Sequence, residues 1–548
     1  FIVLKLMKKS NIVLLIRLFF LLLVVLSLCC NNEKSLKYPP SIDIIPSPKE
    51  IVKDPLNEAL EIDNTISVYI KSPDSKKFFD LFTNDLKVIF SQDLHFKRSD
   101  KINSDISFVV EKSLKDEEYQ IEINKNISIV GGSYNAITMA KSSLIQIIKF
   151  KDNNTLLLPK AKISDKPDSS YRGLMIDLSR MWHDLESIRN VIDMASLYKI
   201  KYLQLHLSDD QAFVFPTDSF PNLPTPDRPY SKKDFRELVE YAKVRGVTII
   251  PEIDVPGHSR QFIETYPEIF DVSNGVKKSN VINIANEKVY SALDQIISEV
   301  AEIFYTSPYI HMGADEAKLD LYKNVTEVKS FMNKNKLGTD IHELYRYFIV
   351  RINKIVKKYD KQMMVWEGFR KEGEIKIPKD IIVFEFETLY NHPKSLIDDG
   401  FTIVNTSWTP LYAVYGGVKN KMAQRAVWSP ERIYKWNKWR WEHFSKSVPA
   451  YKPIQLEKTP QVIGGQMCSW EQSGDAEIPV LRKRIPFFSE RVWNDNPSKS
   501  FEKIFSTVER TDKILSLITN NKRQDSILVG YNFKKDGCLW CIPDEEVN

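Results

Sequence analysis

Two adjacent carboxylates, Asp315 and Glu316 of the segment HMGADEA, are the residues of this sequence that could most directly do chemistry. Cleavage of a glycosidic bond needs an acid that protonates the leaving oxygen and a group that stabilises positive charge at the anomeric carbon. A neighbouring Asp and Glu can supply both. An isolated Asp-Glu pair more often lies on a solvated loop. Whether this pair indicates an active site therefore depends on the residues around it.

Further polar and aromatic side chains stand at the ends of short apolar runs. They include His206 and Asp209 in HLSDDQ, Asp254 and His258 in PEIDVPGH, and Trp366, Trp408, Tyr412, Trp470 and Glu471 at later runs. We interpret the apolar runs as eight strands with amphipathic helices between them. The expected strands are 173–177, 202–207, 247–253, 309–313, 363–367, 381–386, 402–406 and 461–467.

Eight strands alternating with helices are typical of a (β/α)₈ barrel. One of the helices is expected to begin after Ser231, where Asp234 completes a capping-box pattern, and to end before Gly246. A doubly wound open sheet is the alternative, but neither G-x-G-x-x-G nor a P-loop follows any of the strands. In a barrel the carboxyl ends of the strands meet at one mouth. Polar clusters at nearly every strand end therefore favour an active site over solvated loops.

A metal site is the competing interpretation of the polar residues expected at the mouth of the barrel. His206, His258 and His311 could act as ligands together with the acids. Metal-dependent barrel hydrolases commonly carry H-x-H on the first strand, whereas the first strand here, RGLMIDLS, contains no histidine. We therefore expect carboxylate chemistry on a sugar, with no metal and no cofactor.

Composition and charge exclude other classes of protein. The chain has 548 residues, of which 43% are apolar and 27% charged, so whole-chain disorder and a coiled coil are excluded. The net charge is +5, and residues 1–28 carry four positive charges and no acid. The remainder is nearly neutral, which argues against a nucleic-acid partner.

The first residues are typical of a targeting segment. Met7-Lys8-Lys9 precedes an apolar stretch that runs to Leu28 and is interrupted by Arg17. This pattern predicts a secretory signal peptide and an exported protein, either periplasmic or extracellular. Cys29 and Cys30 follow the stretch, so a lipoprotein leader that tethers the protein to a membrane is the alternative. A bulky Leu28 stands where a small residue is usual at a lipoprotein cleavage site.

The rest of the chain divides into three parts. Residues 31–168 are expected to form a small α/β domain, with a hairpin at 119–132 and a helix at 136–150. Residues 169–500 are expected to form the barrel, and residues 501–548 a helical extension and tail. Cys538 and Cys541 have the spacing of half a zinc site without the second half, which favours a local disulfide or plain packing.

HMGADEA resembles the H-x-G-G-D-E motif of family 20 glycoside hydrolases, the β-N-acetylhexosaminidases. YRGLMIDLSR, YLQLHLSDDQAF, PEIDVPGHS, GGQMCSW and RIPFFSERVW resemble other motifs of that family, in the same order. The resemblance covers roughly residues 40–500 and includes the small domain. It implies an exo-acting enzyme that removes terminal β-linked GlcNAc or GalNAc from an oligosaccharide or glycoconjugate. The substrate's own acetamido oxygen is the nucleophile in this family, an exception to the two-carboxylate scheme.

The resemblance also implies roles for individual residues. Glu316 matches the general acid and base, and Asp315 matches the residue that orients the acetamido group. Sugar-binding positions are matched by Arg172, Asp209, His258, Trp366, Tyr412, Trp470 and Glu471. Arg172 would hold sugar hydroxyls with Glu471 near it, and Tyr412 would bind the acetamido carbonyl. A relay to Glu316 could pass through His258 or Asp254.

Three positions depart from the family pattern. Ala314 replaces the second glycine of the motif, which is tolerable only if φ there is not positive. The aromatic wall expected after the sixth strand is a Trp in the family, so Phe384 or Phe386 must take its place. Glu471 directly follows Trp470, whereas the family glutamate often comes one residue later, where this chain has Gln472. A glycan-binding protein without activity is the alternative on this fold, but it would not need Asp315, Glu316 and Tyr412 together.

Overall fold

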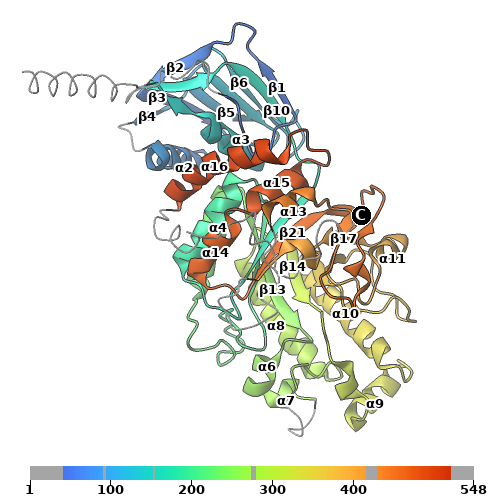
Figure 1. The fold of residues 1–548 in the computed structure, drawn as a ribbon. Coiled ribbons are helices and arrows are strands. Elements are labelled where there is room, and N and C mark those ends of the chain that lie inside the picture. The colour runs from blue at the N-terminus through green and yellow to red at the C-terminus, as the bar shows by residue number, and fades with distance from the viewer. Residues whose placement is uncertain (1–40, 91–93, 152–154, 273–278, 415–428, 520–548) are drawn as a thin grey trace, which may run out of the picture.

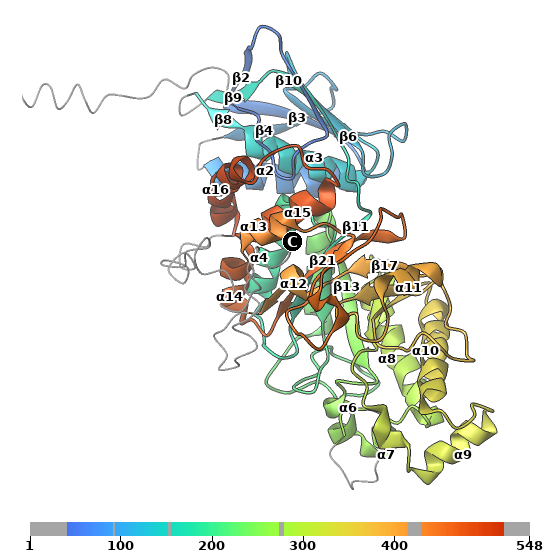
Figure 2. The ribbon, with the colours of Figure 1, turned by 45° about the vertical axis from the view of Figure 1, so that its right-hand side comes forward.

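The computed structural model describes residues 41–90, 94–151, 155–272, 279–414 and 429–519. It contains a small α/β domain seated on one end of a larger α/β barrel (Figures 1 and 2). Within the described residues, every helix is too short or too polar to cross a membrane. The expected leader at 1–30 and the Cys538/Cys541 tail lie outside the described residues.

The small domain is built on a seven-stranded mixed sheet in the order β1-β10-β6-β7-β5-β3-β4. Its strands are β1 (Glu50–Lys53), β3 (Thr65–Lys71), β4 (His95–Ser99), β5 (Ile106–Val110), β6 (Tyr119–Ile123), β7 (Ile127–Gly131) and β10 (Ala161–Asp165). Helices α2 (Ser75–Phe90) and α3 (Tyr134–Ile147) lie between this sheet and the barrel (Figure 1). A second sheet joins β2 (Ala59–Asp63), β9 (Thr155–Pro159) and β8 (Lys149–Phe150). The expected hairpin is confirmed as the antiparallel pair of β6 and β7.

The barrel has eight parallel strands, and the pairing of its first strand with its last closes it. They are β11 (Tyr171–Asp177), β12 (Tyr202–His206), β13 (Thr248–Val255), β14 (Tyr309–Gly313), β15 (Gln362–Trp366), β16 (Ile382–Glu385), β17 (Thr402–Asn405) and β21 (Val462–Trp470). All eight overlap the strands expected from the sequence, so the (β/α)₈ barrel is confirmed and the open sheet is excluded. The strands are buried on both faces, which is why their sequences read as apolar runs rather than alternating ones.

Helices cover the outside of the barrel. The larger ones are α4 (Leu185–Leu197), α5 (Lys232–Val244), α8 (Glu287–Ile303), α10 (Ile341–Lys358) and α15 (Ile485–Trp493). The capping box at Ser231 and Asp234 is present at the start of α5, and Gly246 beyond its end has a φ of +72°. One expectation is wrong: residues 367–381 connect β15 to β16 as a loop, without a helix.

A short extra strand, β18 (Tyr412–Val414), extends the barrel wall at the mouth. It pairs with the carboxyl half of β21, so that Tyr412 lies opposite Cys468 and Val414 opposite Trp470. Because side chains two apart in a strand share a face, Tyr412 and Val414 point the same way. β18 therefore brings two side chains to the mouth that none of the eight barrel strands carries.

The opposite end of the barrel is joined to the small domain. Helix α16 (Phe501–Ile518) lies at this junction and packs on α2 and α4 (Figure 1). Lys199 and Asp165 form a fully buried ion pair of 3.2 Å between the two domains. Tyr119 contributes its hydroxyl, which donates to Asp165 at 2.5 Å. The two domains therefore share buried polar contacts as well as apolar ones.

Candidate active site

A cavity of about 180 Å³ opens at the carboxyl ends of the barrel strands, and it is small enough to suit one sugar ring. It is lined by Arg180, His258, Asp315, Glu316, Phe386, Glu387, Trp408, Tyr412, Val414, Trp470 and Glu471. Six of the nine catalytic and sugar-binding residues expected from the sequence lie in this lining, and so do the expected aromatic residues Phe386 and Trp408; the six are His258, Asp315, Glu316, Tyr412, Trp470 and Glu471. The strand ends therefore do converge on one pocket.

Two more expected residues lie directly behind the lining. Asp209 accepts a hydrogen bond from His258 and forms an ion pair with Arg180. Trp366 is 1% exposed, and its ring packs 6.0 Å from that of Trp470. Trp366 thus supports the pocket wall from beneath instead of forming its surface.

Arg172 does not reach the pocket, so the prediction that it lines the sugar site is wrong. It stands at the amino end of β11, where its guanidinium pairs with Glu117 of the small domain at 2.7 Å. The same guanidinium donates to the carbonyl of Lys199 at 3.1 Å and lies over the ring of Trp493. Active-site residues of a barrel come from the carboxyl ends of strands, and Arg172 is at the other end.

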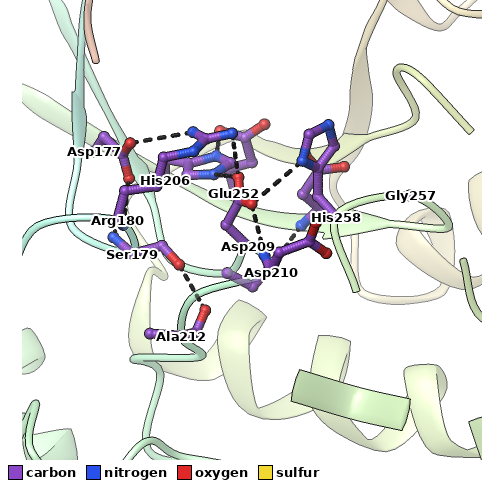
Figure 3. Close-up of polar contacts among 12 residues, drawn as sticks. Asp177, Ser179, Arg180, His206, Asp209, Asp210, Ala212, Glu252, Gly257 and His258 are labelled. Atoms are coloured by element: carbon purple, nitrogen blue, oxygen red, sulfur yellow. Dashed lines mark hydrogen bonds and ion pairs between the residues drawn. The ribbon is translucent and has the colours of Figure 1, made fainter. Parts of the chain in front are cut away.

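Arg180 occupies the place for which Arg172 was expected (Figure 3). It follows the carboxyl end of β11, and its guanidinium contacts Asp177 at 3.1 Å and Asp209 at 2.6 Å. It also lies 5.0 Å from the ring centroid of Trp470. These contacts fix a planar, five-donor group in the pocket wall beside Glu471, which suits the binding of sugar hydroxyls.

A chain of charged groups links Asp209 to Glu316. The Nδ1 atom of His258 lies 3.2 Å from Asp209, and its Nε2 atom lies 3.4 Å from Glu316. The surrounding carboxylates raise the pKa of His258 well above its usual value, so the ring is charged. The hydrogen bond from His258 is the main cause of a lowered pKa at Glu316. Of the two relays left open by the sequence, the structure contains the one through His258.

Asp254 lies beneath Asp315 instead of in the relay. Burial and the charge of Asp315 raise the pKa of Asp254 well above its usual value, so the charged form of this carboxyl is disfavoured. Burial also raises the pKa of Asp315. The backbone at Gly313 approaches Asp254 so closely that any Cβ there would overlap the carboxyl. Glycine is therefore required at this step between β14 and the catalytic pair.

Aromatic rings form one side of the pocket. Phe386 and Tyr412 are parallel, with centroids 6.4 Å apart, and Trp408 lies 4.4 Å from Tyr412. Phe386 lines the cavity, whereas Phe384 is buried below it among Trp366 and His311. Phe386 thus takes the place of the Trp that the family pattern led us to expect.

The other two departures are also resolved. Glu471 lines the cavity, whereas Gln472 is buried and donates to the carbonyl of Ala413 at 2.8 Å. Ala314 has a φ of +71°, the condition under which its methyl group is unfavourable. His258, Glu316 and Glu471 also have positive φ values, and such backbone strain gathers at functional sites.

Two groups of side chains are close enough to hold a metal ion: His206, Glu252 and Asp254, and Asp209, Asp254 and His258. The Oδ1 atom of Asp254, which belongs to both groups, has no hydrogen-bond partner among the described residues, whereas the His206, Glu252, Asp209 and His258 side chains are paired with one another. His206 contacts Glu252 at 2.8 Å and Asp209 at 2.9 Å. Because Asp209 is also paired with Arg180, a metal ion would have to compete with a guanidinium and two imidazoles.

Sequence reasoning missed Arg180, Glu387 and Val414 as pocket residues. A signal existed for Arg180 and Glu387, because each lies just beyond the carboxyl end of an expected strand. Val414 carried none, since β18 is not one of the eight barrel strands.

The catalytic-domain model of glycosyl hydrolase family 20 matches residues 170–496, and the model of domain 2 of that family matches residues 41–166. This chain belongs to glycosyl hydrolase family 20. It is 26% identical over 366 residues to a beta-hexosaminidase of Porphyromonas gingivalis. The aligned region covers 62% of this chain and 47% of that protein. It is also 30% identical over 314 residues to a beta-hexosaminidase of Vibrio furnissii. That aligned region covers 52% of this chain and 51% of the relative.

The chain thus spans about half the length of these two relatives. Among solved structures, a family 20 exo-β-N-acetylglucosaminidase from Vibrio harveyi has the same fold, with a TM-score of 0.73 at 22% identity. That match covers 88% of this chain and 79% of the other.

Proposed function

We propose that the protein is an exo-acting β-N-acetylhexosaminidase that removes terminal β-linked N-acetylhexosamine from glycans. The observation that carries the proposal is the placement of Asp315 and Glu316 side by side in a pocket the size of one sugar ring. Both relatives described above are named beta-hexosaminidases. A pocket of this size accepts the end of a glycan and not its middle, which supports exo action.

Glu316 is the proton donor in this proposal. Its side chain is 55% exposed in the sugar-free pocket, so it can reach the space that a leaving oxygen would enter. The charged ring of His258 lowers its pKa there. Sugar binding displaces water from Glu316 and so raises its pKa, because desolvation penalises the charged form. The proton then passes from Glu316 to the leaving oxygen as the glycosidic bond breaks.

Asp315 acts on the acetamido group. Its Oδ1 atom is buried and has no hydrogen-bond partner among the described residues, so it is available to accept the acetamido N–H. The acetamido oxygen then bonds to the anomeric carbon while the leaving oxygen departs, giving a cyclic oxazolinium ion. Asp315 offsets the positive charge of this ion. In this proposal Tyr412, which also lines the pocket, donates to the acetamido oxygen.

Water completes the reaction with Glu316 now acting as base. Water attacks the anomeric carbon, its proton returns to Glu316, and the bond to the acetamido oxygen breaks. Two displacements at one carbon give net retention of configuration. Arg180 and Glu471 hold hydroxyls of the terminal sugar throughout these steps.

The test is hydrolysis of aryl β-glycosides of GlcNAc and GalNAc by the purified protein. We expect both to be cleaved with release of the β-anomer first, as seen by proton NMR. A parallel sample treated with EDTA should keep its activity, because no step uses a metal ion. Absence of hydrolysis, release of the α-anomer, or loss of activity that zinc restores would contradict the proposal.

We also propose that the protein is exported. The support is the Lys-Lys and apolar pattern of residues 7–28, with a lipid tether at Cys29 or Cys30 as the alternative. Mass spectrometry of the N-terminus of the mature protein distinguishes the two outcomes. A retained leader would contradict both.

A further inference from the structure

We propose that Glu387 is a further substrate-binding residue of the pocket and that it binds the sugar as a neutral acid, by donating a hydrogen bond to a sugar oxygen. The inference rests on the proposed function, since it assigns a role within the same pocket. Glu387 lines the cavity together with Asp315 and Glu316. None of the sequence motifs discussed above includes it.

The loop that carries Glu387 is fixed from below by two buried glutamates. Thr388 donates its backbone N–H to Glu385 at 2.6 Å. Tyr390 and Asn391 donate theirs to one carboxyl oxygen of Glu367. The segment from β16 to Asn391 is therefore held at three points, and Glu387 is directed into the pocket by a fixed backbone.

Those two supporting glutamates are fully buried, and each carries one oxygen without a hydrogen-bond partner among the described residues. Burial raises the pKa of Glu367 to about 8 and that of Glu385 well above its usual value. Glu367 is therefore protonated at and below neutral pH, and burial disfavours the charged form of Glu385 as well. The floor of this side of the pocket therefore consists of two carboxyl groups whose charged forms are disfavoured by burial.

Glu387 itself is pushed toward its neutral form by the pocket. Burial, followed by the negative charges of Glu316 and Asp315, raises its pKa to about 7. One of its oxygens accepts a hydrogen bond from the indole of Trp408, which orients the carboxyl. The group therefore holds a proton that can be donated to a bound molecule.

The charges around Glu387 can be named for the part of the chain that the structure describes. Those on its side of the pocket are Asp315, Glu316, Glu367, Glu385, Tyr390 and Tyr412. The cationic groups in the lining are Arg180 and His258, and each is already paired with Asp209. Because these two positive charges are paired with another carboxylate, neither Arg180 nor His258 pairs with Glu387, and among the described residues the carboxyl keeps its proton up to about pH 7.

A neutral donor at this position makes sugar binding depend on pH. Sugars offer hydroxyl, ring and acyl oxygens as acceptors, and a carboxylate at Glu387 could not donate to any of them. Ionisation of Glu387 would also place a third negative charge beside Asp315 and Glu316. Binding of an uncharged sugar should therefore weaken above pH 7.

The experiment measures binding of N-acetylglucosamine by calorimetry between pH 5.5 and 8.5. The host is Glu316→Gln, so that the titration of the general acid does not contribute. This host lacks the charge of Glu316 that helps to raise the pKa of Glu387, so we expect Kd to begin rising below pH 7, by up to about tenfold per pH unit. Adding Glu387→Gln, which keeps a neutral donor at every pH, should hold Kd near its acidic value throughout. Adding Glu372→Gln, which removes an exposed negative charge outside the pocket, should leave the pH dependence of the host unchanged.

A second variant separates binding from folding. Glu387→Leu keeps a similar size without a donor, and at pH 6 it should bind about tenfold more weakly than Glu387→Gln. A flat Kd in the host, or a pH dependence that survives Glu387→Gln, would overturn the role of Glu387. Hydrolysis of aryl N-acetylglucosaminide by the wild type is measured in parallel. Its absence would overturn the proposed function, whereas hydrolysis together with a flat Kd would overturn only this inference.

Discussion

The Nε2 atom of His258 lies 3.4 Å from a carboxylate oxygen of Glu316 in the sugar-free pocket. This contact ties the acidity of the proton donor to a histidine that is itself held by Asp209. It also explains why a carboxyl needed as an acid has a lowered pKa before the sugar arrives. The catalytic pair is therefore part of a charge network that extends from β12 through β13 to β14.

Replacement of Glu316 by Gln removes the transferable proton and keeps the shape of the side chain. We expect kcat on a natural disaccharide to fall by roughly 10²–10⁴-fold, the usual contribution of general acid–base catalysis. The loss should be smaller on an aryl substrate, because an acidic leaving group needs less protonation. Steady-state kinetics on both substrates measure the difference, and near wild-type turnover on the disaccharide would show that Glu316 is not the acid.

The two arginines at the ends of β11 offer a matched comparison. Arg180→Lys keeps the charge but loses the planar fork that suits two hydroxyls, so kcat/KM should fall by about 10- to 100-fold. Arg172→Lys should leave kcat/KM within about twofold and lower the free energy of unfolding by about 2 kcal/mol, because it weakens buried contacts to Glu117 and Lys199. Kinetics and thermal unfolding of both variants test this, and the reverse outcome would restore Arg172 to the pocket.

The two arginines also show which features of the fold and the pocket could be predicted from the sequence and which could not. The eight apolar runs of the sequence correspond to the eight barrel strands. Parallel strands of a barrel are buried on both faces, so each one appears in the sequence as a continuous apolar run. Most pocket residues could be predicted because they follow the carboxyl ends of those strands. The arginine was misassigned because it was matched to a motif without asking which end of the strand it occupied. The role of β18 could not be predicted, since pairing with a distant strand leaves no local pattern.

Replacement of Ala314 by Gly should stabilise the protein. Ala314 has a φ of +71°, a conformation that costs a residue with a Cβ about 1–2 kcal/mol and glycine almost nothing. After the greater chain entropy of unfolded glycine is subtracted, we expect a gain of up to about 1 kcal/mol. Ala317→Gly in the same segment is the control, since Ala317 is not among the residues with positive φ and should lose stability. Chemical denaturation compares them, and equal effects at the two positions would contradict the assignment of strain.

Stability should decline on the alkaline side because of the buried Glu367. Its pKa is about 8 in the folded protein, raised first by burial, and near 4.5 when exposed. A carboxyl with a raised folded pKa stabilises the fold below its unfolded pKa, and this contribution is lost as the pH rises toward 8. Glu367→Gln keeps the acceptor for Tyr390 and Asn391 without the titration, so its unfolding free energy should fall less between pH 5 and pH 8. If the unfolding free energies of wild type and variant fell equally between pH 5 and pH 8, Glu367 would be ruled out as the source of the decline.

The central claim is that the acetamido oxygen of the substrate, and not a carboxylate, attacks the anomeric carbon. The most direct measurement is kcat for a series of aryl β-glucosaminides whose N-acyl group carries zero, one, two or three fluorine atoms. Each fluorine withdraws electrons from the acyl oxygen, so we predict a steep stepwise fall in kcat across the series and very slow cleavage of the corresponding 2-hydroxy glucoside. Rates that do not respond to fluorination, together with a covalent glycosyl-enzyme trapped on Asp315 or Glu316, would contradict the account.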